Sequence, residues 1–140
     1  MIVWQKSMTL IKLIYGLNAF PESEKYSLVS QTRRAAVSVA SNIAEGWGRG
    51  QNKYFSHFLN ISKGSLFELE TQIIISVDLK YITEVESNQI LGLTSEISKM
   101  ISGLQRSLKS YNDSNDADEP LSDYELPSPK TMNKELKTKN

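Results

Sequence analysis

The sequence predicts an all-α protein, an up-down-up-down antiparallel four-helix bundle followed by a disordered C-terminal tail. Apolar residues recur at helical spacing in four separate segments, and short stretches of Gly, Pro or capping residues separate those segments. The composition also changes after Tyr111, where acidic and turn-forming residues replace apolar ones. We therefore expect the bundle over residues 1–111 and the tail over residues 112–140.

The first two helices are separated by a proline. The first helix is expected over residues 4–18, where apolar side chains cover a wide surface. Phe20-Pro21 ends it, because proline disfavours helical geometry in the residue that precedes it. The second helix is expected over residues 22–45, and Glu22 and Glu24 favour its first turn by interacting with the positive end of the helix dipole.

The second helix carries two different faces. An apolar stripe from Tyr26 to Trp47 is expected to face the core, and Gly46 is the expected left-handed cap. The other face combines hydroxyl, amide and charged groups, and it is covered by another helix of the chain, by another copy of the chain, or by a ligand. The predicted structural polar network joins this face to two carboxylates of the third helix: Ser38, Ser41, Asn42, Glu45, Glu68 and Glu70.

The third helix is expected over residues 52–80, with Asn52 as its N-cap. The fourth helix begins at Thr83, which forms a capping box with Glu86. Gly64 lies in the middle of the third helix, where glycine costs ~1 kcal/mol relative to alanine. We therefore expect a close helix crossing at Gly64-Ser65.

The residue composition argues against an enzyme. Cysteine is absent, and His57 is the only histidine, so disulfides, thiolate chemistry, catalytic triads and multi-histidine metal sites are excluded. We predict no cofactor and no metal, and we interpret His57 as a structural residue of the bundle. No secretory signal pattern and no apolar run of ~18 residues is present. The expected protein is cytoplasmic and makes no membrane contact.

The net charge of zero hides an asymmetry between the two parts of the chain. Residues 1–111 carry 12 Lys and Arg against 9 Asp and Glu, whereas residues 112–140 carry 4 Lys against 7 Asp and Glu. A mildly basic body is compatible with RNA or DNA as a partner. The acidic tail is either an interaction arm that competes for this body or a solubilising appendage.

Residues 46–50 (GWGRG) are either a helix connector or a turn that contacts phosphate. They lack the GxGxxG spacing and the GK[ST] sequence of phosphate-binding loops, which favours the connector. Trp47 either stacks on a base or closes the end of the core. Arg34 can instead neutralise Glu45 or Glu68. The predicted nucleic-acid contacts are the basic residues near this region: Arg33, Arg34, Arg49 and Lys53.

Two blocks of sequence resemble a known family. These are LVSQTRRAAVSVASNIAEGWGR and, shortly after it, YFSHFLNISKGSLFELETQIIISVDLKYI. Together they resemble the four-helix-bundle protein family encoded in intervening sequences of bacterial large-subunit (23S) rRNA genes, and the resemblance covers roughly residues 4–110. It implies a homopentamer with a basic surface suited to nucleic acid and without catalytic activity. The accessory variability determinant of diversity-generating retroelements is similar to this family and binds a reverse transcriptase and RNA.

Two hypotheses follow for the function. The first is a non-enzymatic, homo-oligomeric, by resemblance pentameric, helix-bundle protein that binds RNA or DNA through the four basic residues. The second is an oligomeric scaffold that binds a protein partner such as a reverse transcriptase. In that case Arg33, Arg34 and Glu68 are structural.

Overall fold

The computed structural model describes residues 1–114. The predicted disordered tail, residues 112–140, lies outside this part except for its first three residues, which are helical. Within residues 1–114 the chain is entirely helical, which confirms the predicted fold class. None of its helices combines the length and the apolar composition needed to cross a membrane. The elements are α1 (Ile2–Tyr15), the short 3-10 helix η1 (Glu22–Glu24), α2 (Leu28–Gly48), α3 (Asn52–Asp78) and α4 (Glu84–Ser114).

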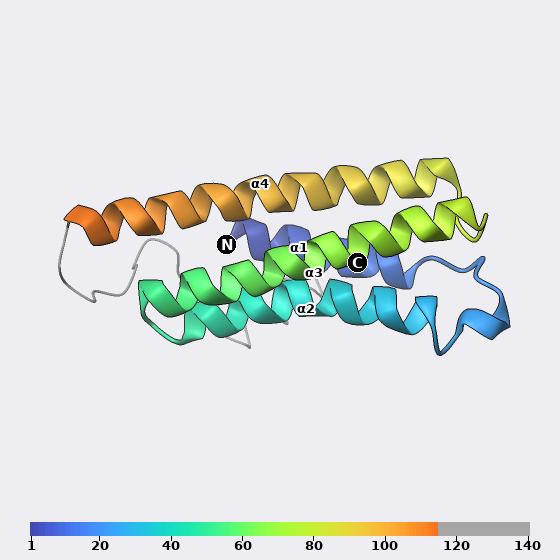
Figure 1. Cartoon of the computed structure of the whole chain (residues 1–140), viewed down its shortest axis with the longest axis horizontal. Coiled ribbons are helices and arrows are strands. Elements are labelled where there is room, and N and C mark those ends of the chain that lie inside the picture. The colour runs from blue at the N-terminus through green and yellow to red at the C-terminus, as the bar shows by residue number, and fades with distance from the viewer. Residues whose placement is uncertain (115–140) are drawn as a thin grey trace.

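The four α-helices form a closed antiparallel bundle (Figure 1). Each helix packs against its neighbours in sequence, and α1 also packs against α4. The helices differ in length: α1 has 14 residues and α4 has 31. At 1.5 Å per residue these lengths are about 21 Å and about 46 Å. At the end of the bundle where α4 terminates, α1 is therefore absent (Figure 1).

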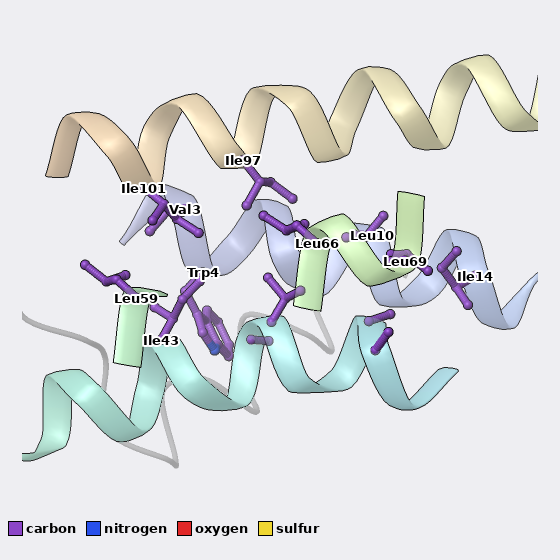
Figure 2. Packing of buried hydrophobic residues seen from close by; sticks show 14 of the residues in the cluster. Val3, Trp4, Leu10, Ile14, Ile43, Leu59, Leu66, Leu69, Ile97 and Ile101 are labelled. Carbon is purple, nitrogen blue, oxygen red and sulfur yellow. The ribbon is translucent and has the colours of Figure 1, made fainter. Parts of the chain in front are cut away.

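The core is built from apolar side chains of all four α-helices, which point into the space between the ribbons (Figure 2). Leu10, Ile43, Leu66 and Ile97 come from α1 to α4 respectively, and each is fully buried. Trp4 of α1 is also buried among them. Burial of this kind contributes about 1.5–3 kcal/mol per large side chain, so the core supplies most of the folding free energy.

The second helix begins later than its sequence pattern predicts. Residues 22–24 form η1 instead, and α2 begins at Leu28 after a break at Ser27. The carboxylate of Glu24 accepts a hydrogen bond from the backbone N–H of Leu28 at 3.2 Å, which satisfies one free donor of the first turn. Tyr26 lies before the helix and is 89% exposed, so the predicted extension of the apolar stripe to this residue was wrong.

Gly46 does not end α2, contrary to the prediction. It is buried inside the helix, and a Cβ atom there would lie 2.7 Å from the Cβ of Phe58. Glycine is therefore required for the close approach of α3. The left-handed residue is Gly50, whose φ is +72°.

Three further predictions concern the start of α4, the start of α3 and the middle of α3. The capping box is confirmed, since the Thr83 Oγ1 accepts from the Glu86 N–H at 3.1 Å. Gln51, rather than Asn52, precedes α3 as its N-cap residue, and it makes no side-chain capping bond. At the predicted close crossing at Gly64-Ser65, Ser65 is buried and its hydroxyl lies 2.8 Å from that of Ser38 of α2, whereas Gly64 is exposed with open space around its Cβ position and does not serve the contact.

Candidate nucleic-acid interface

The structure does not bring the four predicted basic residues together. Arg33 is half-buried, and its guanidinium lies 4.5 Å from the ring centroid of Tyr15. The buried Nε of Arg33 has no hydrogen-bond partner among the described residues. Arg34 is exposed and makes no ion pair with the side chains of residues 1–111. Arg33 therefore lies on the α1 side of α2, whereas Arg34 faces solvent.

Arg49 is engaged with Glu45 on its own helix face. Its Nη2 and Nε lie 2.7 Å and 3.1 Å from the Glu45 Oε1, and its guanidinium lies 5.4 Å from the ring centroid of Phe58. The alternative pairing of Glu45 with Arg34 is thus not formed. Trp47 is half-buried and packs edge-on against Phe55 at 5.6 Å, so it closes the end of the core.

The predicted polar network is only partly assembled within the chain. Ser38 of α2 and Ser65 of α3 are hydrogen bonded at 2.8 Å, and Asn42 donates to the Ser38 Oγ at 3.0 Å. Close by, the buried Ser62 hydroxyl donates to the backbone carbonyl of Val39 at 2.9 Å. These bonds satisfy polar groups in the contact between α2 and α3.

The other predicted members of the network lie outside this contact. Ser41 is exposed, and Glu45 pairs with Arg49 as described above. Glu68 is also exposed and accepts a bond from Gln72 at 3.3 Å. Glu70 accepts a hydrogen bond from Thr94 at 2.9 Å and so joins α3 to α4.

A basic groove lies between the first half of α3 and the last turns of α4. Its volume is about 800 Å³. Among the residues whose side chains are described, four Lys or Arg line it and no carboxylate does. Lys53 is the only member of the predicted set among them. The groove residues are Lys53, Ser56, His57, Asn60, Lys63, Ser102, Gln105, Arg106, Leu108 and Lys109, and we call this surface the α3–α4 groove.

Hydrogen bonds between the two helices hold the walls of the α3–α4 groove at a fixed separation. The Gln105 side-chain amide donates to the Asn60 Oδ1 at 2.7 Å and to the Ser56 carbonyl at 3.3 Å. The Lys63 Nζ donates to the Ser102 Oγ at 3.0 Å. The groove lies at the end of the bundle that α1 does not reach, because α1 is so much shorter than α4 (Figure 1).

The cations of the α3–α4 groove have no charged partner among the side chains of residues 1–111. The ion pairs of that part of the chain involve Lys6, Lys25 and Arg49 instead. Unpaired Lys and Arg side chains beside hydroxyl and amide groups suit phosphate, which accepts both ionic and neutral hydrogen bonds. The described residues also contain no group of three or more His, Asp or Glu side chains that could hold a metal ion.

The groove differs in two ways from what the sequence predicts. His57 was interpreted as a structural residue inside the bundle, but it is exposed at the groove, with its ring 5.4 Å from that of Phe58. Lys63, Arg106 and Lys109 were not predicted as site residues. The available sequence signal was the absence of acidic residues from residues 97–111, which contain Lys99, Arg106 and Lys109.

Comparison with known proteins identifies the family. The model of the 23S rRNA-intervening sequence protein family matches residues 1–103, which is most of the chain and nearly all of the bundle. The chain belongs to this family. The intervening-sequence protein also resembles a solved structure from Bacteroides thetaiotaomicron, described as a protein with unknown function from the S23 ribosomal protein family. No curated protein matches it.

The similarity to the Bacteroides protein extends over most of the chain. The TM-score is 0.67 at 25% sequence identity, and the alignment covers 74% of this chain and 97% of the other. The aligned share of the Bacteroides protein is thus nearly complete, whereas a quarter of the intervening-sequence protein lies outside the alignment. The comparison agrees with the four-helix fold and assigns no activity.

Proposed function

We propose that this intervening-sequence protein is a non-enzymatic helix-bundle protein that binds nucleic acid, RNA above all, through phosphate contacts in the α3–α4 groove. The observation that carries the proposal is the set of four cations that line one groove, with no carboxylate among its described lining residues. Binding to phosphate would be largely independent of sequence, because phosphate contacts position a nucleic acid but do not read its bases.

The geometry of the individual cations supports this function. Lys53 and Lys63 extend from α3, and Arg106 and Lys109 from α4, so a bound backbone would be contacted from both walls. Arg106 offers a planar fork that can bind phosphate with two parallel hydrogen bonds, whereas lysine acts as a point charge. Arg49 is a poorer candidate than the sequence suggested, since it would have to leave Glu45.

A direct binding measurement tests the proposal. Fluorescence anisotropy of a labelled RNA oligonucleotide, titrated with the full chain at low salt, should show saturable binding that weakens steeply as salt is added. The reason is that each neutralised phosphate releases counterions. Binding that is absent at low salt, or that does not change with salt, would overturn the proposal.

We also propose that the protein acts as a homo-oligomer, with the pentamer implied by the family resemblance as the leading stoichiometry. The support is an exposed surface that we call the α2–α3 face, where Ile61 and Ile75 of α3 are 38% and 41% exposed. Arg34 and Glu68 are exposed on it and make no ion pair among the described side chains, residues 1–111. The α2–α3 face comprises Arg34, Ser41, Glu45, Ile61, Glu68 and Ile75.

Reversing the charges of Arg34 and Glu68 on the α2–α3 face tests whether this face forms the contact between copies of the chain. The antiparallel register that pairs Ser38 with Ser65 puts Arg34 and Glu68 at one level of the bundle, so neighbouring copies can pair one residue with the other. Light scattering should give an oligomer for the native chain and a smaller mass for Arg34→Glu. Arg34→Glu combined with Glu68→Arg should restore the mass. A monomeric native chain would overturn this part of the proposal.

A protein partner is the second candidate function, and the same α2–α3 face, which exposes Ile61 and Ile75 beside charged groups, favours it. In that case the protein is a scaffold, and a reverse transcriptase is the kind of partner that the resemblance to the accessory variability determinant implies. Affinity capture from a cell extract with and without nuclease separates the two functions. A partner protein that is retained after nuclease treatment supports the scaffold, whereas one that is lost supports binding through nucleic acid.

A further inference from the structure

Phe67 is an aromatic side chain without an evident structural role. It lies in the middle of α3 and is 56% exposed, although a phenylalanine ring gains most stability when it is buried. It follows Lys63 by four residues, so the two side chains lie on the same face of the helix, about 6 Å apart. Phe67 therefore lies just beyond the inner end of the α3–α4 groove.

The groove suits a single strand better than a duplex. Hydrogen bonds join its two walls, from Gln105 to Asn60 and from Lys63 to Ser102, so a rigid duplex can only rest on the rims. Lys63 lies in the wall, half-buried and bonded to Ser102, so a broad ligand resting on the rims would not reach it well. A single flexible backbone can follow the surface of the groove and reach Lys63.

The length of the cationic stretch suits a short strand. Lys53 and Lys63 are ten residues apart on α3, which is about 15 Å along the helix axis. At the spacing of about 3.4 Å per nucleotide in a stacked strand, this stretch covers about four phosphates. A strand that follows the groove inward from Lys53 would then bring its next base to Phe67.

We infer that the α3–α4 groove binds single-stranded rather than duplex nucleic acid, and that Phe67 is the platform on which an unpaired base stacks. The inference rests on the proposed nucleic-acid function and specifies its ligand. Every base has a flat face, so stacking on Phe67 tolerates any sequence, in agreement with phosphate contacts elsewhere in the groove. In a duplex the bases stack on one another, and Phe67 would have no base to bind.

The test compares one RNA sequence as a single strand and as a duplex. Anisotropy is measured for the full native chain and for Phe67→Ala, Phe67→Tyr and Ile74→Ala. Ile74 is the matched control, because it is 51% exposed on the same line of α3, seven residues further from the groove. Thermal unfolding followed by circular dichroism establishes that each variant is folded.

The native chain should bind the single strand more tightly than the duplex. Phe67→Ala should weaken single-strand binding about 5- to 150-fold, as expected for the loss of one base–aromatic stack, and should leave duplex binding unchanged. The slope of affinity against salt should stay the same, because no charge is removed. Phe67→Tyr should retain the affinity, since it retains the aromatic face, and Ile74→Ala should behave like the native chain.

Two results would overturn the inference while leaving the groove as a phosphate site. One is equal or tighter binding of the duplex by the native chain, and the other is a Phe67→Ala variant that binds the single strand as well as Ile74→Ala does. If the native chain binds neither form at low salt, the proposed function fails together with the inference.

Discussion

Removing charge from one wall of the α3–α4 groove should change the salt dependence of binding by a predictable amount. The double variant Arg106→Gln/Lys109→Gln removes two of the four cations that line the groove. Both side chains are exposed, so the change should alter stability by no more than about 0.5 kcal/mol. The fold is thus retained, and any effect on binding comes from the lost charges.

The expected magnitude follows from the number of phosphates neutralised. For a single strand, the slope of log affinity against log salt is about −0.7 per phosphate, so four contacts give about −2.8 and two give about −1.4. Between 50 and 200 mM salt, the native chain should lose about 50-fold in affinity and the double variant about 7-fold. Anisotropy titrations at several salt concentrations in this range measure both slopes.

A matched control distinguishes the loss of charge in the groove from the loss of net charge elsewhere on the protein. Lys12→Gln/Lys25→Gln also removes two positive charges, but from α1 and from the segment before α2, at the end of the bundle away from the groove. This control should keep the native slope. If it lowers the slope as much as the groove variant does, or if the groove variant keeps the native slope, the assignment of the site is refuted.

The remaining predictions concern stability, measured by urea unfolding at a fixed protein concentration. Gly46→Ala should destabilise the chain by about 1–3 kcal/mol, because its Cβ would lie 2.7 Å from that of Phe58. Gly48→Ala, where a Cβ meets nothing within 4 Å, is the control and should not destabilise; equal losses would contradict the close packing at Gly46. Leu66→Ala should cost about 2–5 kcal/mol, since the side chain is fully buried; a loss near zero would contradict the core assignment. Gly64→Ala should stabilise by about 0.4–1 kcal/mol, since the site is helical and open, and a destabilised variant would show a hidden contact.

The fold could be predicted from the sequence because its main signals are local and repeated. Four apolar stripes at helical spacing, the Phe20-Pro21 break and the Thr83–Glu86 capping box all agree with one another. The errors occurred where a tertiary contact overrode a local preference. Glycine often ends a helix, and the sequence therefore predicted a helix end at Gly46. In the structure α3 approaches Gly46 so closely that a larger residue would clash, so the glycine is needed for packing.

The candidate site was harder to predict, because it depends on the register of two helices. Lys63 and Arg106 are 43 residues apart in the sequence, and each alone resembles an ordinary solvated side chain. The packing of α4 on α3 brings the two side chains to one groove. The short α1 does not extend to this end of the bundle. The Arg49–Glu45 pair, by contrast, is a local contact four residues apart that the sequence pattern would have allowed us to predict.

Mapping the contact by ultraviolet cross-linking and mass spectrometry tests the central claim most directly. The full chain is irradiated with bound single-stranded RNA, and the cross-linked peptides are identified. The account predicts cross-links within residues 53–67 of α3 and 102–109 of α4. Cross-links confined to residues 33–49 of α2 and the turn after it would contradict it and would favour the contacts first predicted from the sequence.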